Sequence, residues 1–140
     1  MTTVFDKKLI GSLEELRKAV EKMKELDGKS SVVDILGTEY SIHRQSAKEN
    51  PKLEGNNGIC EQYSKEIILN TLEEEKQDVM CVENVKEFEK KVLRHEIIHA
   101  YLGESGLRSS SEWAENEEMV DWFAIQLPKM FETFKELDIL

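Results

Sequence analysis

The spacing of the apolar residues changes along the chain, and these changes restrict the folds that it can adopt. In residues 12–26 the apolar side chains recur every three or four positions, as on one face of a helix: Leu13, Leu16, Val20, Met23 and Leu26. Ser12 and Glu15 have the spacing of a capping box at the start of this segment. The chain is therefore expected to begin with an amphipathic helix.

The middle of the chain has the composition of strands. The β-branched residues 32–36 are followed by Gly37-Thr38 and a second alternating run at residues 40–42, which predicts a hairpin. Residues 46–58 hold Pro51 and two glycines among polar residues and are expected to form an exposed loop. Residues 59–69 read as one strand whose end, residues 67–69, is buried.

From Asn84 onward the pattern is helical again. Asn84 and Glu87 predict a helix start, and Gly103 suits its end. The serines 109–111 are expected to cap a second helix that runs to Leu127, where Pro128 breaks or kinks it, and a short helix follows over residues 129–137. We therefore expect one α+β domain over residues 1–140: an N-terminal helix, a small antiparallel or mixed sheet, and C-terminal helices.

Charge and composition exclude several classes of protein. With 19 Lys plus Arg against 29 Asp plus Glu, the net charge is −10, which argues against a nucleic-acid surface. The longest apolar runs have four residues, far too few to cross a membrane. The start of the chain lacks the apolar core of a secretory signal, so we expect a cytoplasmic protein with Cys60 and Cys81 reduced.

The segment His95-Glu96-Ile97-Ile98-His99 has the H-E-x-x-H pattern of zinc metalloproteases. Residues four apart lie one above the other on a helix, so the imidazoles of His95 and His99 can converge on one ion. Glu96 lies beside them, where it can act as a base without being a ligand. For this composition the pattern arises by chance with a probability of roughly 0.01.

A catalytic zinc ion needs a third protein ligand, which we expect downstream. Helix phase favours Glu117, because it is the one glutamate on a stripe of mostly small residues that can pack on the histidine helix. Glu118 shares a face with Trp122 and stays the alternative. The other acidic candidates are Glu104, Glu112, Glu115 and Asp121.

His95-Glu96-x-x-His99 followed by Glu117-x-x-x-Asp121 resembles the gluzincin arrangement of thermolysin-type peptidases. The segment Asp121-Trp122-Phe123-Ala124, with the later Leu127-Pro128, also resembles the ImmA/IrrE-like metallopeptidases of phages and mobile elements. The resemblance implies that Glu117 binds zinc and that Asp121 orients a ligand histidine. It covers roughly residues 85–128.

These observations predict a zinc metallopeptidase with Glu96 as its catalytic base, which cuts a specific cytoplasmic protein or peptide and is phage or prophage encoded. The resemblance implies that substrate binds as an added strand, for which residues 59–64 are the candidate edge, although a plain structural strand is the alternative. His43, Tyr63 and Arg108 are the residue types that could stabilise the carbonyl oxygen. The rival functions are a zinc-bearing protein interaction module without turnover and a metal-free helical module.

Overall fold

The computed structural model describes residues 11–18, 30–72 and 84–140. The chain divides into two compact units, residues 1–31 and 32–140. In the first unit residues 11–18 are helical, in agreement with the start of the helix expected over residues 12–26. The rest of that expected helix, together with Cys81, lies outside the described residues.

Four strands form one mixed sheet in the order β1-β2-β4-β3, namely β1 Ser31–Ile35, β2 Thr38–Gln45, β3 Gly58–Glu61 and β4 Glu66–Asn70. The predicted hairpin of β1 and β2 is confirmed. Its turn residues, Leu36 and Gly37, both have positive φ angles, 51° and 87°, as in the turns that suit the twist of two-residue hairpins. β2 pairs with β4 in parallel, and β3 pairs with β4 antiparallel. β3 is therefore an edge strand.

The single strand expected over residues 59–69 is wrong, because the structure has two strands there. A polar turn over residues 62–65 separates β3 from β4, with Lys65 at a φ of 58°. The buried end was predicted correctly: Ile67, Ile68 and Leu69 are 0 to 7% exposed. The expected loop 46–58 contains a short 3-10 helix, Pro51–Leu53, whose Leu53 is fully buried.

The helix α2 extends over Val85–Glu104 and begins as predicted, with the Asn84 side chain accepting a hydrogen bond from the Glu87 N–H. It does not end at Gly103. The chain continues helical to Glu104, and the left-handed residue that follows is Gly106, at a φ of 80°. Gly103 instead lies in the last turn of α2 against the side chain of Gln62.

The C-terminal helices differ from the prediction at their start and at Pro128, where one long helix replaces the two that were expected. The serines 109–111 precede a 3-10 helix, Glu112–Glu115, and Asn116 caps the long helix α3, Glu117–Glu136, by accepting a hydrogen bond from the Met119 N–H. α3 continues through Pro128 without a break. Pro128 has no N–H for the Ala124 carbonyl, and Arg94 of α2 donates to that carbonyl instead, at 2.6 Å. A contact from the neighbouring helix therefore replaces the missing helical hydrogen bond.

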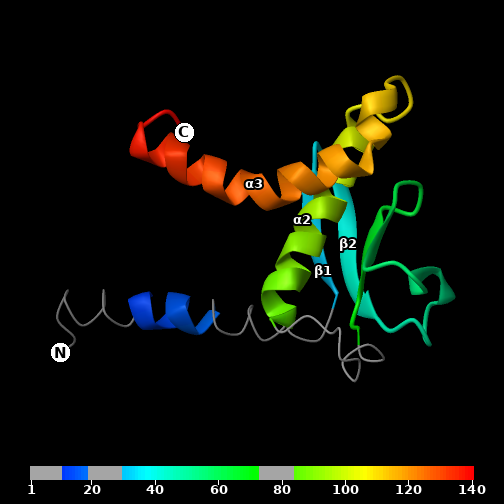
Figure 1. Cartoon of the computed structure of the whole chain (residues 1–140). Coiled ribbons are helices and arrows are strands. Elements are labelled where there is room, and N and C mark those ends of the chain that lie inside the picture. The colour runs from blue at the N-terminus through cyan, green and yellow to red at the C-terminus, as the bar shows by residue number, and fades with distance from the viewer. Residues whose placement is uncertain (1–10, 19–29, 73–83) are drawn as a thin grey trace, which may run out of the picture. The chain divides into compact units, whose positions relative to one another are not determined.

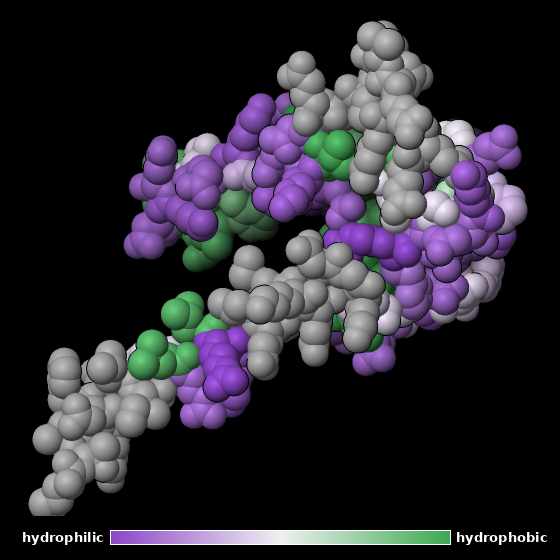
Figure 2. All heavy atoms as spheres, turned by 90° about the horizontal axis from the view of Figure 1, so that it is seen from below, coloured by the Kyte–Doolittle hydropathy of each residue, from purple (hydrophilic) through white to green (hydrophobic). Residues whose placement is uncertain are grey.

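Helix α2 packs on one face of the sheet and α3 crosses over α2 (Figure 1). The core lies between α2 and the sheet and contains Ile35, Tyr40, Ile42, Ile67, Leu69, Val92 and Ala100. The expected α+β class is thus confirmed. Among the described residues, no helix has the length and apolarity needed to cross a membrane. Figure 2 shows hydrophilic residues over most of the described surface on the side that it displays.

Candidate metal centre

Two helices bring the predicted ligands together. α2 carries His95 and His99 one turn apart, and Glu117 is the first residue of α3. The helices approach closely because the small residues of the stripe on α3 are fully buried: Val120 and Ala124 are both 0% exposed, as is Ala114 of the preceding 3-10 helix. This packing places the Glu117 carboxylate opposite the two imidazoles.

The ligand atoms of the three side chains form a small triangle. The Nε2 atoms of His95 and His99 lie 3.1 Å apart, and the Glu117 carboxylate lies 2.9 Å from the first and 3.1 Å from the second. Ligands held at about 2.0 to 2.1 Å from a tetrahedral zinc ion lie about 3.3 Å from one another. Only a small expansion of the triangle is needed, so the donor set and its spacing fit a zinc ion.

The two histidines are mostly enclosed, whereas the glutamate is not. The side chains of His95 and His99 are 16% and 11% exposed, and that of Glu117 is 69% exposed. Burial lowers the pKa of His99, despite the opposing effect of the Glu117 charge. The neutral imidazole is therefore favoured, and this is the form that binds a metal ion.

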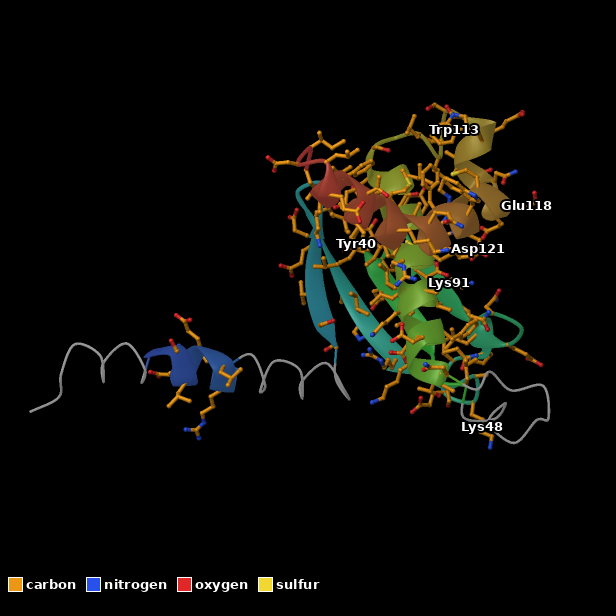
Figure 3. The ribbon with its side chains drawn as sticks, turned by 60° about the vertical axis from the view of Figure 1, so that its left-hand side comes forward. Tyr40, Lys48, Lys91, Trp113, Glu118 and Asp121 are labelled. Atoms are coloured by element: carbon orange, nitrogen blue, oxygen red, sulfur yellow. The ribbon has the colours of Figure 1, made fainter. Side chains whose placement is uncertain are left out.

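Asp121 lies behind His95. Its Oδ1 accepts a hydrogen bond from His95 Nδ1 at 3.2 Å, which leaves Nε2 of that ring free to face the other ligands. Lys91 Nζ donates to the same oxygen at 2.9 Å, and this hydrogen bond lowers the pKa of Asp121. Figure 3 shows Asp121 beside Lys91, between α2 and α3. The contact is the one that the resemblance implies for Asp121, and it fixes the tautomer and orientation of the ring.

Glu96 points toward β3 and is only 6% exposed. A Cβ atom on Gly58 would lie 3.0 Å from its Cγ and 3.1 Å from its Oε1, so the absence of a side chain at Gly58 makes room for the carboxylate. Within the part of the chain that the structure describes, the Glu96 oxygens accept no hydrogen bond. Burial raises the pKa of Glu96 to about 7. The group is thus suited to take up and release a proton near neutral pH.

These side chains line a cleft of about 530 Å³ between β3 and the two helices. Its walls include residues 55–61, the three candidate ligands, Glu96 and Asp121, with Lys52, Lys91 and Arg108 as the basic residues. The volume is within the range of small-molecule and peptide sites.

The other predicted acidic candidates lie away from the histidines. Glu118 is exposed and lies on the outer side of α3 (Figure 3). Glu104 accepts hydrogen bonds from Thr38, Tyr40 and Lys65, which tie the end of α2 to the sheet. Glu112 and Glu115 are exposed residues of the 3-10 helix before α3.

The three candidates for stabilising the carbonyl oxygen lie in different parts of the structure. Tyr63 is 98% exposed in the turn between β3 and β4. His43 lies on β2, where its Nε2 is 3.0 Å from the Ser41 hydroxyl, and it lines a different hollow. Arg108 lines the cleft.

Sequence reasoning missed three residues that shape the site. Lys91 precedes His95 by one helical turn, so its spacing was a usable signal. Gly58 and Arg94 carried none, because their roles depend on contacts with segments distant in sequence: Glu96 for the first and the Ala124 carbonyl for the second.

Comparison of the chain with protein-family models, with curated proteins and with solved structures finds no match.

Proposed function

We propose that the protein is a zinc metallopeptidase that hydrolyses peptide bonds of a protein or peptide substrate in the cytoplasm. The observation that carries this proposal is the convergence of His95, His99 and Glu117 beside the buried carboxylate of Glu96 in one open cleft. Three protein ligands leave a fourth position free, as in catalytic rather than structural zinc sites. The resemblance to peptidases of phages and mobile elements suggests a similar origin.

A zinc ion held by these three side chains would polarise a carbonyl group and lower the pKa of water to about 7. Glu96 takes a proton from the attacking water as the new C–O bond forms. It then donates that proton to the leaving amine as the C–N bond breaks, so that one water is consumed for each bond cleaved. Asp121 holds the His95 ring in place throughout.

The cleft also offers a place for an extended peptide. β3 pairs with β4 on one side and forms the edge of the sheet on the other, and its residues line the cleft. A peptide that adds to this edge as a further strand would gain main-chain hydrogen bonds and would pass Glu96 and the ligand triangle. This favours a peptide substrate over a compact small molecule.

The alternative is a zinc-bearing interaction module. The observation that favours it is the exposed apolar surface of α3, where Trp122, Ile125 and Phe131 are 41 to 53% exposed. A module of this kind has no need of Glu96, which is the residue that separates the two functions.

The metal is tested first. Protein purified without chelator should contain about one zinc per chain by elemental analysis, and zinc should raise the melting temperature of the chelator-treated protein. Glu117→Ala should lose far more zinc affinity than the neighbouring Glu118→Ala. Absence of metal together with no thermal shift would contradict the site, and the reverse ranking of the two variants would move the third ligand by one residue.

Catalysis is tested with Glu96→Gln at equal zinc content. Removal of the base should lower turnover by about 10² to 10⁴ fold and leave zinc binding intact. Because a peptidase with one cognate target can ignore generic peptides, cleavage is measured both on unstructured peptides and by proteomics of host cells. A protein with full zinc occupancy that generates no cleavage product, and whose cellular effect survives Glu96→Gln, is an interaction module.

A further inference from the structure

Arg108 comes from the segment that joins α2 to the 3-10 helix before α3. Its backbone N–H donates to the Leu102 carbonyl at 3.0 Å, which fastens this segment to the last turn of α2. The side chain extends to the cleft wall and is 38% exposed. The positively charged side chain of Arg108 is therefore held at the cleft by a backbone hydrogen bond to α2, the helix that carries the two histidines.

The guanidinium group of Arg108 has one long ion pair within the described residues. Its partner is Glu115, with Nε and Oε1 3.8 Å apart, which is too far for a hydrogen bond. Among the described residues that line the cleft, the other two basic side chains are engaged: Lys52 pairs with Glu61 and Lys91 with Asp121, each at 2.9 Å. Within the described part of the chain the Arg108 guanidinium makes this long ion pair and no hydrogen bond, so its donors can bind a ligand.

The side chain of Arg108 lies in the same cleft as the reacting groups. The walls of this cleft include Glu96, His99 and Cys60 of the edge strand β3 as well as Arg108. The guanidinium therefore shares one cleft with the proton-transferring carboxylate, a ligand histidine and the edge strand.

We propose that Arg108 is a catalytic residue that donates hydrogen bonds to the oxygen of the scissile carbonyl. This inference rests on the proposed peptidase function. As water adds to the carbonyl carbon, the C=O electron pair moves to the oxygen, and the developing negative charge lies opposite a fixed cation. A guanidinium group is well suited to this role, because it is always charged and presents several donors in one plane.

The inference is tested by ligand binding, so that no substrate has to be known. The probes are benzylphosphonate, whose tetrahedral anionic head resembles the reacting carbonyl, and benzyl mercaptan, which offers one sulfur and no oxygen. Both are titrated by calorimetry into the zinc-loaded protein. Arg108→Gln should weaken benzylphosphonate by about 10- to 100-fold, the value of a charge-assisted hydrogen bond, and benzyl mercaptan by less than about threefold.

Lys52→Gln is the matched control, because it removes another cation from the same cleft wall. It should change the affinities for benzylphosphonate and benzyl mercaptan by less than about threefold. If the charge of the cleft acts only in general, Lys52→Gln and Arg108→Gln would both bind both probes more weakly, and this result would overturn the inference. Arg108→Lys retains the charge without the planar set of donors and should recover only part of the phosphonate affinity. Circular dichroism and the zinc affinity of each variant verify that the fold and the metal site are intact.

Other outcomes also decide the inference. Phosphonate affinity in Arg108→Gln within twofold of the unmodified protein, or no phosphonate binding by the zinc-loaded unmodified protein, would overturn the role of Arg108 and leave the zinc site standing. Failure of the unmodified protein to bind zinc would overturn the proposed function itself. If Arg108→Gln does not fold, Arg108→Lys provides the comparison, and unchanged phosphonate binding in that variant counts against the donor role.

Discussion

The hydrogen bond from Arg94 to the Ala124 carbonyl makes a testable contribution to stability. Pro128 would normally be expected to end or kink a helix, yet α3 continues through it. Pro128 has no N–H to donate to the carbonyl of Ala124, which is fully buried. That carbonyl instead accepts a hydrogen bond from Arg94 Nε at 2.6 Å. Arg94→Met removes this donor while retaining most of the length of the side chain.

The expected cost follows from the chemistry of the contact. A hydrogen bond from a charged donor is worth about 1.5 to 3 kcal/mol, and an unpaired buried carbonyl costs about 1 to 3 kcal/mol. We therefore expect Arg94→Met to lower the free energy of unfolding by about 2 kcal/mol. In a Pro128→Ala background the new N–H can reach the Ala124 carbonyl, so the same substitution should cost about 1 kcal/mol less.

The assay is urea denaturation followed by circular dichroism, with chelator present so that metal binding does not contribute. The two single variants and the double variant form a cycle whose coupling energy isolates the shared carbonyl. Lys90→Met is the control, because Lys90 is an exposed cation of the same helix, and it should change stability by no more than about 0.5 kcal/mol. An equal cost of Arg94→Met in both backgrounds would refute the reasoning.

Three further predictions concern the site. Asp121→Asn should reduce zinc affinity about 10- to 100-fold by calorimetry, because the His95 ring loses the carboxylate that orients it, and unchanged affinity would leave Asp121 a packing residue. Gly58→Ala should lower the free energy of unfolding by about 1 to 3 kcal/mol, because its Cβ would lie 2.9 Å from Val92 Cγ1 and close to Glu96. Gly103→Ala is the control for it: the added Cβ meets only the movable end of Gln62 and the helix gains propensity, so a comparable loss there would contradict the steric argument. In a Cys81→Ser background Cys60 should react with a thiol reagent at pH 8 far more slowly in the native protein than in denaturant, because burial raises the pKa of its thiol to about 12, and equal rates would contradict this.

Much of the arrangement around the histidines follows from local periodicity. The positions of His95 and His99 one turn apart, and of Glu117 on the same stripe as Asp121, are set by 3.6 residues per turn once α2 and α3 form. Asn84 identifies the start of α2 for the same reason, since a capping side chain acts on its own helix. These features involve interactions within a few residues and can be read from the sequence.

Other features depend on segments that meet only in the folded chain. A proline at position 128 predicts that the helix breaks there. The helix α3 continues because Arg94, on another helix, donates a hydrogen bond to the Ala124 carbonyl. The parallel pairing of β2 with β4 leaves β3 at the edge beside the cleft, and no local pattern contains that order. Likewise packing alone places Gly58, the first residue of β3, against Glu96, and Arg108, in the loop after α2, on the cleft wall. Helical periodicity is local, so the amino-acid pattern specifies which helix faces carry the ligand types. Burial and charge at the site come from residues far apart in the chain, so only the folded protein reveals what surrounds the ligands.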